Sequence, residues 1–248
     1  MSFEPIAEWW DARVGSEGDK SHRHTILPAM LRIFGDVNGR RILDLGCGNG
    51  SSSRWLASAG AIVHGVEIAP SLVTAAKRRE QNNRLGITYT VGNASDLSEF
   101  GDDTYDAVQA NMVLMDAEDG SGLLREAARV LRQGGQFVLS ITHPCFNIAG
   151  GSSRFQETDH FGTNHSVRVW RYLDPFSAEG TVASGQPVPH TYYHRPLSWY
   201  SRVLRSAGLV ITHLDEPVPD DEFAEANPDS YDRQLEVPWF LIIGTVKT

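Results

Sequence analysis

ILDLGCGNG, residues 42–50, joins an apolar run that holds one aspartate to three glycines at alternate positions. The run predicts a buried strand. The glycines predict a tight turn where a ligand can approach bare backbone, because glycine lacks a Cβ. The next segment has helical apolar spacing, with an expected N-cap within serines 51–53 and Gly60 at its end. A helix that starts behind such a turn offers unpaired N–H groups to a carboxylate or a phosphate.

The spacing of the glycines separates this turn from other nucleotide-binding motifs. Nicotinamide and flavin sites carry G-x-G-x-x-G, and a P-loop needs Gly-Lys-Ser/Thr after its glycines. Gly46, Gly48 and Gly50 instead form D-x-G-x-G-x-G, followed by Ser51. This spacing disfavours an NAD-dependent oxidoreductase and excludes a P-loop. An ordinary glycine-rich turn between a strand and a helix is the simpler alternative.

The motif resembles motif I of the class I methyltransferases that use S-adenosyl-L-methionine. The resemblance implies an α/β, Rossmann-like fold with a seven-stranded, mostly parallel sheet of order 3-2-1-4-5-7-6. The last strand is antiparallel, and helices cover both faces. Within the class, the chain looks most like the small-molecule enzymes of quinone biosynthesis and the tailoring enzymes. The resemblance also implies that the methionine part of the cofactor is held by Asp44, Gly46, Cys47, Gly48, Asn49 and Gly50.

The second expected strand, residues 61–68, ends in an acid. Glu67 stands about twenty residues past the glycines, where a carboxylate can accept hydrogen bonds from both ribose hydroxyls of a nucleoside. A buried acid is costly without a partner, and a structural salt bridge is the alternative reading of this position. We expect Glu67 and the adjacent Ile68 to contact the cofactor.

The third expected strand, residues 87–91, is followed by Asn93 and Ala94. Similar enzymes usually carry an aspartate at the position of Asn93, where it accepts a hydrogen bond from the adenine amino group. An amide oxygen can accept the same bond without the charge, and Asp96 is a second candidate for this role. We expect Asn93 and Ala94 to lie beside the adenine.

A fourth strand is expected over residues 105–115, with Asn111 near its carboxyl end. Ligands of open α/β sheets bind outside the carboxyl ends of the strands. The resemblance places a residue from this strand end against the methionyl group and the transferable methyl. Asn111 and Met112 are therefore expected in the cofactor site, and Leu114 in the acceptor site.

The remaining core elements follow from hydrophobic periodicity and turn residues. They are expected as a helix before residue 134, a fifth strand at 136–142, a helix at 197–207, and strands at 209–214 and 238–245. Ser121 and Ser198 are the expected N-caps of the two helices. The acidic, proline-bearing run 215–236 is expected to be a long loop.

Residues 143–196 are expected to form a substrate cap after the fifth strand. They are rich in aromatic residues and histidines, and residues 150–153 look like a flexible hinge. Segments 167–173 and 188–194 have strand composition and are expected to pair. A small satellite hydrophobic cluster is the alternative. The acceptor-binding residues are expected to be His22, Leu114, Trp170, His190, Tyr193 and His194.

The histidines of this segment do not predict a metal site. Pro189 favours a strand for residues 190–194, and four residues along a strand span about 13 Å, which is too far for His190 and His194 to share one zinc ion. Neither Cys-x-x-Cys nor His-Glu-x-x-His is present in the sequence. We expect no metal.

The N-terminal residues 1–38 are expected to form a helical lid over cofactor and acceptor, as in similar methyltransferases. A solvated loop is the alternative for the polar run 16–24, and Trp10 belongs either to the lid or to the core. The expected division of the chain is a lid (1–38), a cofactor-binding core (39–142), a cap (143–196) and the C-terminal part of the core (197–248).

His143 is the expected catalytic base. It follows the fifth strand directly, and Pro144 limits its backbone to extended conformations, which restricts where the imidazole points. An imidazole titrates near neutrality and can take a proton from a hydroxyl or an amine. The alternative is that His143 only orders the loop or contacts the acceptor.

The whole chain of 248 residues carries a net charge of −9, which argues against a nucleic-acid partner. Two cysteines and no apolar leader favour a reducing, cytoplasmic location, and no segment is apolar enough to span a membrane. The sequence therefore predicts a methyltransferase acting on oxygen or nitrogen of a small molecule. A non-catalytic protein that only binds the cofactor is the alternative from another class.

Overall fold

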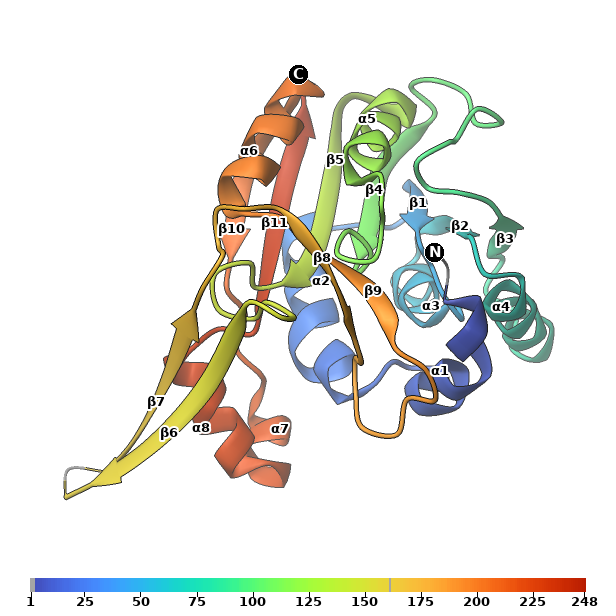
Figure 1. Ribbon diagram of the computed structural model, residues 1–248. Coiled ribbons are helices and arrows are strands. Elements are labelled where there is room, and N and C mark those ends of the chain that lie inside the picture. Colours follow the sequence, from blue (N-terminus) through green and yellow to red (C-terminus); the bar gives the residue numbers. More distant parts are fainter. Residues whose placement is uncertain (1–2, 161) are drawn as a thin grey trace.

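The computed structural model describes residues 3–160 and 162–248; the other three residues, which fall in the expected lid and cap, lie outside the described part. Its centre is a seven-stranded sheet of order β10-β11-β5-β4-β1-β2-β3 (Figure 1). The strands are β1 (Arg41–Leu45), β2 (Ile62–Glu67), β3 (Thr88–Val91), β4 (Tyr105–Asn111), β5 (Leu131–Thr142), β10 (Leu209–Asp215) and β11 (Phe240–Lys247). Strand β11 runs antiparallel to β5 and β10, and the other neighbours pair parallel. The expected order 3-2-1-4-5-7-6 is confirmed.

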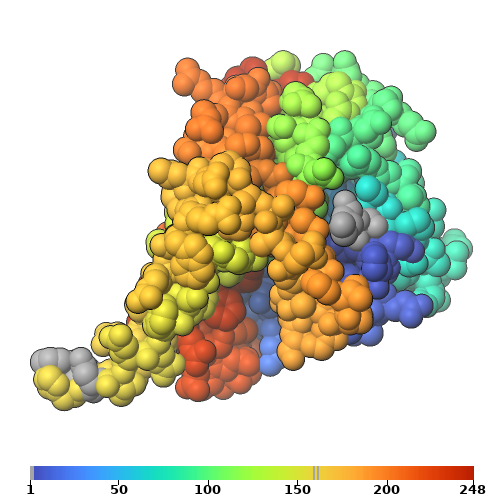
Figure 2. All heavy atoms as spheres, viewed as in Figure 1, coloured from blue at the N-terminus to red at the C-terminus, as the bar shows by residue number. Residues whose placement is uncertain are grey.

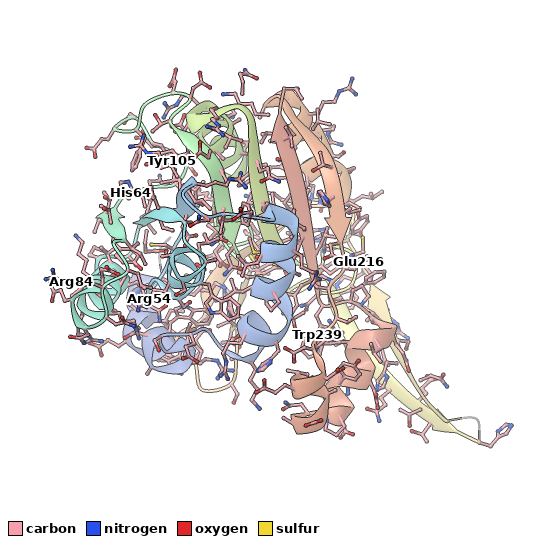
Figure 3. The ribbon with its side chains drawn as sticks, turned by 180° about the vertical axis from the view of Figure 1, so that it is seen from behind. Arg54, His64, Arg84, Tyr105, Glu216 and Trp239 are labelled. Carbon is pink, nitrogen blue, oxygen red and sulfur yellow. The ribbon has the colours of Figure 1, made fainter. Side chains whose placement is uncertain are left out.

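Helices cover both faces of this sheet (Figures 1 and 3). They are α1 (Ala7–Val14), α2 (Leu27–Phe34), α3 (Ser51–Ser58), α4 (Pro70–Asn82), α5 (Gly120–Val130), α6 (Leu197–Ser206), α7 (Asp221–Ala226) and α8 (Pro228–Glu236), with a 3-10 helix η1 (Glu4–Ile6) and a π-helix η2 (His22–Ile26). Alternation along β1 divides the core: Ile42 packs in the cluster under α2, α3 and α4, and Leu43 in the cluster under α5 and α6. Among the described helices, none is long and apolar enough to cross a membrane.

The expected serine caps are wrong at three helices. Gly50 is the N-cap of α3, and serines 51–53 lie inside the helix. Helix α5 is capped by Asp119, whose carboxylate accepts a hydrogen bond from the backbone of its third helical residue, and not by Ser121. Pro196 precedes α6, so Ser198 lies within its first turn. In each case the N-cap lies before the serine: it is a glycine at α3, an aspartate at α5 and a proline at α6.

Two strand boundaries also differ from expectation. Strand β4 ends at Asn111 because Met112 has a positive φ of 57°, which turns the chain out of the sheet. Strand β5 begins at Leu131, directly after α5, and contains the two glycines that were expected to stop the helix. Gly134 has a φ of 73°, and the register against β4 shifts in this region, so these glycines accommodate an irregular strand start.

The run 215–236 is not a loop, because it contains α7 and α8. The Asp220 carboxylate accepts a hydrogen bond from the N–H of Phe223 and caps α7. Pro228 stands in the first turn of α8, where its missing N–H costs nothing. Acidic and proline-bearing composition here marks helix starts rather than irregular chain.

The expected cap contains two hairpins, and the expected strand pairing within it is wrong. Strand β6 (Ser152–Asp159) pairs with β7 (Gly162–Val169), and β8 (Phe176–Gly180) pairs with β9 (His190–His194). Each strand pairs with its neighbour in sequence, which closes a shorter loop than the expected pairing of 167–173 with 188–194. The β6–β7 hairpin projects from the body of the molecule, whereas β8 and β9 lie against it (Figures 1 and 2).

Candidate cofactor and acceptor site

A cavity of about 510 Å³ opens beside the carboxyl ends of β1, β2, β3 and β4. This is the edge at which open α/β sheets bind ligands, and sites for small molecules usually measure roughly 300–1,000 Å³. The expected cofactor residues that line it are Gly46, Cys47, Gly48, Asn49, Glu67, Ile68, Asn93, Ala94, Asn111 and Met112. The structure thus brings these residues, from four strand ends, to one cavity.

The lining also includes residues that the sequence prediction missed. They come from the N-terminal segment (Phe3, Val14), the start of α3 (Ser51, Ser52), the loop after β3 (Ser95) and the loop after β4 (Asp116, Ala117, Glu118, Asp119). Trp10, left open between lid and core, lines the cavity as well. The serines could have been found from their place directly behind the glycine turn. Residues 116–119 could not, because the strand was expected to run to residue 115 and the turn that brings them to the cavity begins at Met112.

The glycine turn presents open backbone to the cavity at Gly48. Its φ is 55°, and a Cβ built there would meet no protein atom within 4 Å. Gly46 has a φ of 65°, but a Cβ there would overlap the side chain of Val113. Gly48 is therefore required for access to the cavity, and Gly46 for packing of the turn against the loop after β4.

Gly48→Ala is expected to weaken binding of S-adenosylhomocysteine more than it destabilises the fold, and Gly46→Ala is the matched control. Both variants carry the strain of a left-handed residue, about 1–2 kcal/mol. Only Gly46→Ala adds a clash inside the protein, so it should lower the melting temperature further. Thermal unfolding and calorimetric titration of the two variants measure this. Equal losses of stability with unchanged affinity in Gly48→Ala would contradict the assignment.

Glu67 is buried at the end of β2 and is held by backbone donors. Its Oε1 accepts a hydrogen bond from the N–H of Ala69 at 2.8 Å, and its Oε2 accepts one from the N–H of Gly48 at 3.1 Å. Burial raises the pKa of Glu67, although the two backbone donors oppose this. Each carboxylate oxygen keeps a further lone pair, which is what two ribose hydroxyls would need.

Asp44 does not reach the cavity, although it was expected to contact the cofactor. It is fully buried, and its Oδ2 accepts hydrogen bonds from the hydroxyls of Ser52 at 2.9 Å and Ser53 at 2.6 Å. Its Oδ1 accepts one from the side-chain amide of Gln109 at 3.0 Å. Gly50, the N-cap of α3, is likewise absent from the described lining. Asp44 ties β1 to β4 and α3, and so fixes the shape of the turn.

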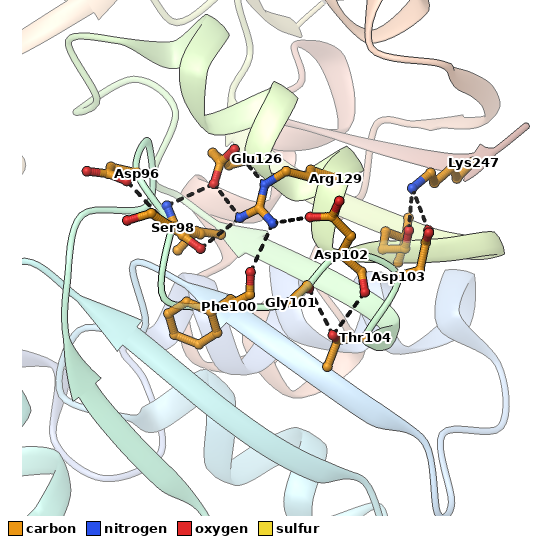
Figure 4. Close-up of polar contacts among 12 residues, drawn as sticks. Asp96, Ser98, Phe100, Gly101, Asp102, Asp103, Thr104, Glu126, Arg129 and Lys247 are labelled. Atoms are coloured by element: carbon orange, nitrogen blue, oxygen red, sulfur yellow. Dashed lines mark hydrogen bonds and ion pairs between the residues drawn. The ribbon is translucent and has the colours of Figure 1, made fainter.

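The loop after β3 carries the residues that were expected to lie beside the adenine. Asn93 lines the cavity, and Asp96 does not; the Asp96 carboxylate accepts a hydrogen bond from the N–H of Ser98 instead. Arg129 of α5 holds this loop by donating to the carbonyls of Leu97 at 2.7 Å and Phe100 at 2.9 Å (Figure 4). Of the two candidates for the adenine contact, Asn93 is therefore the one that lines the cavity.

The N-terminal segment forms the wall that faces the glycine turn. Trp10 and His22 both line the cavity, and His22 is buried. Nδ1 of His22 lies 2.8 Å from the carboxylate of Asp19. The segment is attached to the turn through Asn49, whose side-chain amide donates to the carboxylate of Asp11 and to the carbonyl of Gly15, both at 2.9 Å.

The other expected acceptor residues lie away from the cavity. Leu114 is fully buried, and its carbonyl accepts a hydrogen bond from Arg195. Trp170 is exposed after β7. The ring of His194 donates to the carbonyl of Tyr172, and the backbone of Tyr193 donates to Met115. No described residue of the expected cap lines the cavity.

His190 reaches the site indirectly, through Asp116 on the cavity wall. Its Nε2 lies 3.2 Å from Oδ1 of Asp116, but the two buried atoms are not aligned for a hydrogen bond and have no other partner among the described residues. Burial raises the pKa of Asp116. Burial lowers the pKa of His190, but the adjacent carboxylate outweighs this and raises it. Among the described residues, no group of three or more possible ligands could hold a metal ion.

His143 is also placed outside the cavity lining. Its Nε2 lies 2.8 Å from Glu216, and its Nδ1 accepts a hydrogen bond from the N–H of Cys145 at 3.1 Å. The ring stacks on Phe146 with 4.7 Å between centroids, and burial lowers the pKa of His143. The physical reason is the strand order: β4 separates β5 from β1, so the end of β5 opens toward β11 and its loops.

Comparisons with known proteins agree with this geometry. A methyltransferase domain family matches residues 43–139. The ubiquinone biosynthesis O-methyltransferase of Xanthomonas oryzae pv. oryzae is 33% identical over 135 residues, which cover 53% of this chain and 55% of that protein. The chain thus spans about half the length of the curated relatives it matches.

Two solved structures extend the likeness over most of the chain. An S-adenosylmethionine dependent methyltransferase from Mesorhizobium loti is 27% identical, with a TM-score of 0.73, covering 89% of this chain and 96% of that one. The CcbJ methyltransferase from Streptomyces caelestis shares the fold at 21% identity, with a TM-score of 0.64, covering 98% and 96%.

The matched domain and the fold show what this chain shares with known proteins. Residues 43–139 match a methyltransferase domain, and the chain has the fold of the S-adenosylmethionine-dependent methyltransferases. S-adenosylmethionine is the cofactor that the cavity fits: Gly48 leaves open backbone at its wall, and Glu67 offers free carboxylate lone pairs at the end of β2.

Proposed function

We propose that this protein transfers the methyl group of S-adenosylmethionine to a hydroxyl or amino group of a small molecule. The observation that carries the proposal is that one cavity joins the glycine turn and Glu67 to Trp10, His22 and Asp116. The first pair suits a nucleoside cofactor. The other three supply an aromatic wall and two titratable groups, which suit an organic acceptor beside it.

Within the cavity, each expected cofactor residue has a proposed role. The backbone around Gly48 binds the methionine part, and the Glu67 carboxylate accepts both ribose hydroxyls. Asn93 and Ala94 flank the adenine. Asn111, at the end of β4, lies against the methionyl group. These roles agree with the placement of the residues on the cavity wall.

The cofactor supplies an already activated methyl group. The chain therefore has to position the acceptor and exclude water. Its residues must hold the nucleophile in line with the bond that breaks, in a site from which water is excluded. Trp10 and Phe3 give the N-terminal wall an apolar surface for this. A base is needed only where the nucleophile must lose a proton.

The charges of the cavity support a small molecule over a nucleic acid. Its described lining contains Glu67, Asp116, Glu118 and Asp119 but no lysine or arginine, and the chain carries a net charge of −9. Phosphate groups therefore find no cation in the site. Both cysteines are free, which fits a reducing compartment and supports a cytoplasmic location as part of the proposal.

The proposal is tested in two steps on the whole chain. Calorimetry should show binding of S-adenosylhomocysteine and none of NAD. Transfer of a labelled methyl group should then occur to catechol or to benzylamine, neutral and amine probes chosen because the lining lacks cations. Absence of S-adenosylhomocysteine binding would overturn the cofactor assignment. Binding without transfer to any of a broad panel of hydroxylated and amine acceptors would favour a protein that only binds the cofactor.

A further inference from the structure

We infer that His22, oriented by Asp19, is the general base of the methyl transfer. The N-terminal segment holds this histidine beside the cofactor site. This rests on the proposed function. Among the described residues that line the cavity, His22 is the one histidine. The base is therefore placed on the segment expected to be a lid, and not on the sheet, where His143 was expected.

The contacts of Asp19 fix the tautomer of the His22 imidazole. Its Oδ1 lies 2.8 Å from Nδ1 of His22 and accepts a second hydrogen bond from the His22 backbone N–H at 3.0 Å. Burial would raise the pKa of Asp19, but the hydrogen bonds from His22 outweigh it and hold the pKa at about 2. An ionised carboxylate can only accept, so Nδ1 carries a hydrogen, and in the neutral imidazole Nε2 keeps the lone pair.

Packing holds the ring in one place. His22 is buried at the start of η2, a π-helix that passes directly into α2, and such wide turns occur often at functional sites. Gly18 has a φ of 94°, and a Cβ there would lie 2.7 Å from the Cβ of His22. The backbone before Asp19 can approach the Cβ of His22 this closely only because residue 18 is glycine.

The same segment is bonded to the cofactor motif itself. Asn49 of the glycine turn donates to Asp11 and to the carbonyl of Gly15, and Arg78 of α4 lies 3.3 Å from the same aspartate. The turn that would hold the methionine part of the cofactor therefore also positions the segment that carries the base. Residues 11–22 therefore fix the position of the His22 imidazole relative to the bound cofactor.

Two further histidines that are buried and paired with carboxylates, His190 and His143, do not suit the role. Nε2 of His190 points to Asp116, and both ring nitrogens of His143 are engaged outside the cavity. With His22 as base, a lone pair of the acceptor forms the bond to the methyl carbon, and the methyl–sulfur bond breaks with its electron pair going to sulfur. The proton leaves the acceptor for Nε2 of His22 and then passes to water. The acceptor class is a hydroxyl or N–H compound that is still protonated at neutral pH.

Turnover of two catechols that differ in acidity tests the role. His22→Gln should lower kcat on catechol by about 10²–10⁴-fold and leave the affinity for S-adenosylhomocysteine within about threefold. On 4-nitrocatechol, which ionises far more readily, the loss should be much smaller, because no base is needed. His24→Gln is the matched control, since His24 lies on the same π-helix and also contacts a carboxylate, that of Asp220.

Asp19 is a positioning residue and has its own readout. Asp19→Asn should lower kcat on catechol, and Asp19→Glu should restore part of it. Nitrogen NMR of the S-adenosylhomocysteine complex should show His22 protonated at Nδ1 and bare at Nε2, and Asp19→Asn should change this tautomer. Near-normal turnover of His22→Gln, equal losses on both catechols, or a protonated Nε2 would each overturn the inference. If the unaltered protein methylates neither catechol, the proposed acceptor class fails, and the NMR measurement still decides the state of the imidazole.

Discussion

Replacing Glu67 with alanine is expected to weaken the binding of S-adenosylhomocysteine tenfold or more. The change removes a carboxylate placed to accept both ribose hydroxyls, and hydrogen bonds to a charged acceptor are worth about 1.5–3 kcal/mol each. The N–H groups of Gly48 and Ala69 lose their acceptor as well. Gly48 lines the cavity, where water can replace the carboxylate, whereas Ala69 is buried. Calorimetric titration measures the affinity, and thermal unfolding without cofactor should show only the loss from one unpaired buried N–H, about 1–3 kcal/mol.

The affinity should also depend on pH through Glu67. Burial raises the pKa of Glu67, so the carboxylate is protonated at a higher pH than an ordinary glutamate. The full affinity is present above that pKa and is lost as the pH falls through it, because a protonated oxygen no longer accepts. Glu67→Gln keeps the shape and one acceptor, and should remove this pH dependence. An unchanged dissociation constant in Glu67→Ala would show that the nucleoside is held elsewhere.

Replacing Asp44 with alanine is expected to damage the fold rather than cofactor contacts. The change leaves three buried donors, on Ser52, Ser53 and Gln109, without their acceptor. Unpaired buried polar groups cost about 1–3 kcal/mol each, so we expect a loss of about 3–5 kcal/mol in the free energy of unfolding. Chemical denaturation of the variant and of the parent protein measures this difference.

Two controls separate the effect at Asp44 from that at Glu67. Asp44→Asn retains one acceptor oxygen but turns an amide donor toward hydroxyls or Gln109, so it should be destabilising to a smaller degree than Asp44→Ala. Ser53→Ala removes one donor without leaving the carboxylate alone, because Ser52 and Gln109 still pair with it. A fully stable Asp44→Ala with weakened cofactor binding would restore the direct cofactor role that the sequence predicted.

Local sequence pattern was sufficient to predict those features of the fold that depend on a single strand or a single turn. The apolar run before Gly46 had to be a buried strand, and the alternation of Ile42 and Leu43 had to supply two core faces. The acid at the end of the second strand had to lie near the turn, because parallel neighbours end at the same edge of a sheet. The order of all seven strands came from the resemblance to a family, and no local rule would have given it.

Hydrogen-bond partners could not be read from the sequence. Serines behind a glycine turn usually cap the helix, but here Ser52 and Ser53 donate to Asp44, which lies on a different element. The carboxylate that the resemblance assigned to the cofactor is thus satisfied inside the protein. The positive φ of Met112 ended the fourth strand early and placed Asp116 on the cavity wall, and nothing in the apolar run marked that turn.

By itself, the sequence predicted the residues that line the proposed cofactor half of the site: a glycine turn with open backbone, a carboxylate at the end of the next strand and an asparagine after the third strand. Local pattern was sufficient here because each of these residues lies at or next to the end of a predicted strand. Only the tertiary structure decided the acceptor half. Local sequence does not show whether His143, after a strand, or His22, in a polar run, lies at the cavity. Strand β4 separates the end of β5, and with it His143, from the glycine turn. The hydrogen bond between Asn49 and Asp11 holds the segment of His22 against that turn. Which imidazole meets the acceptor depends on packing between segments far apart in the chain, and such packing is settled by the sum of many weak contacts that no local pattern encodes.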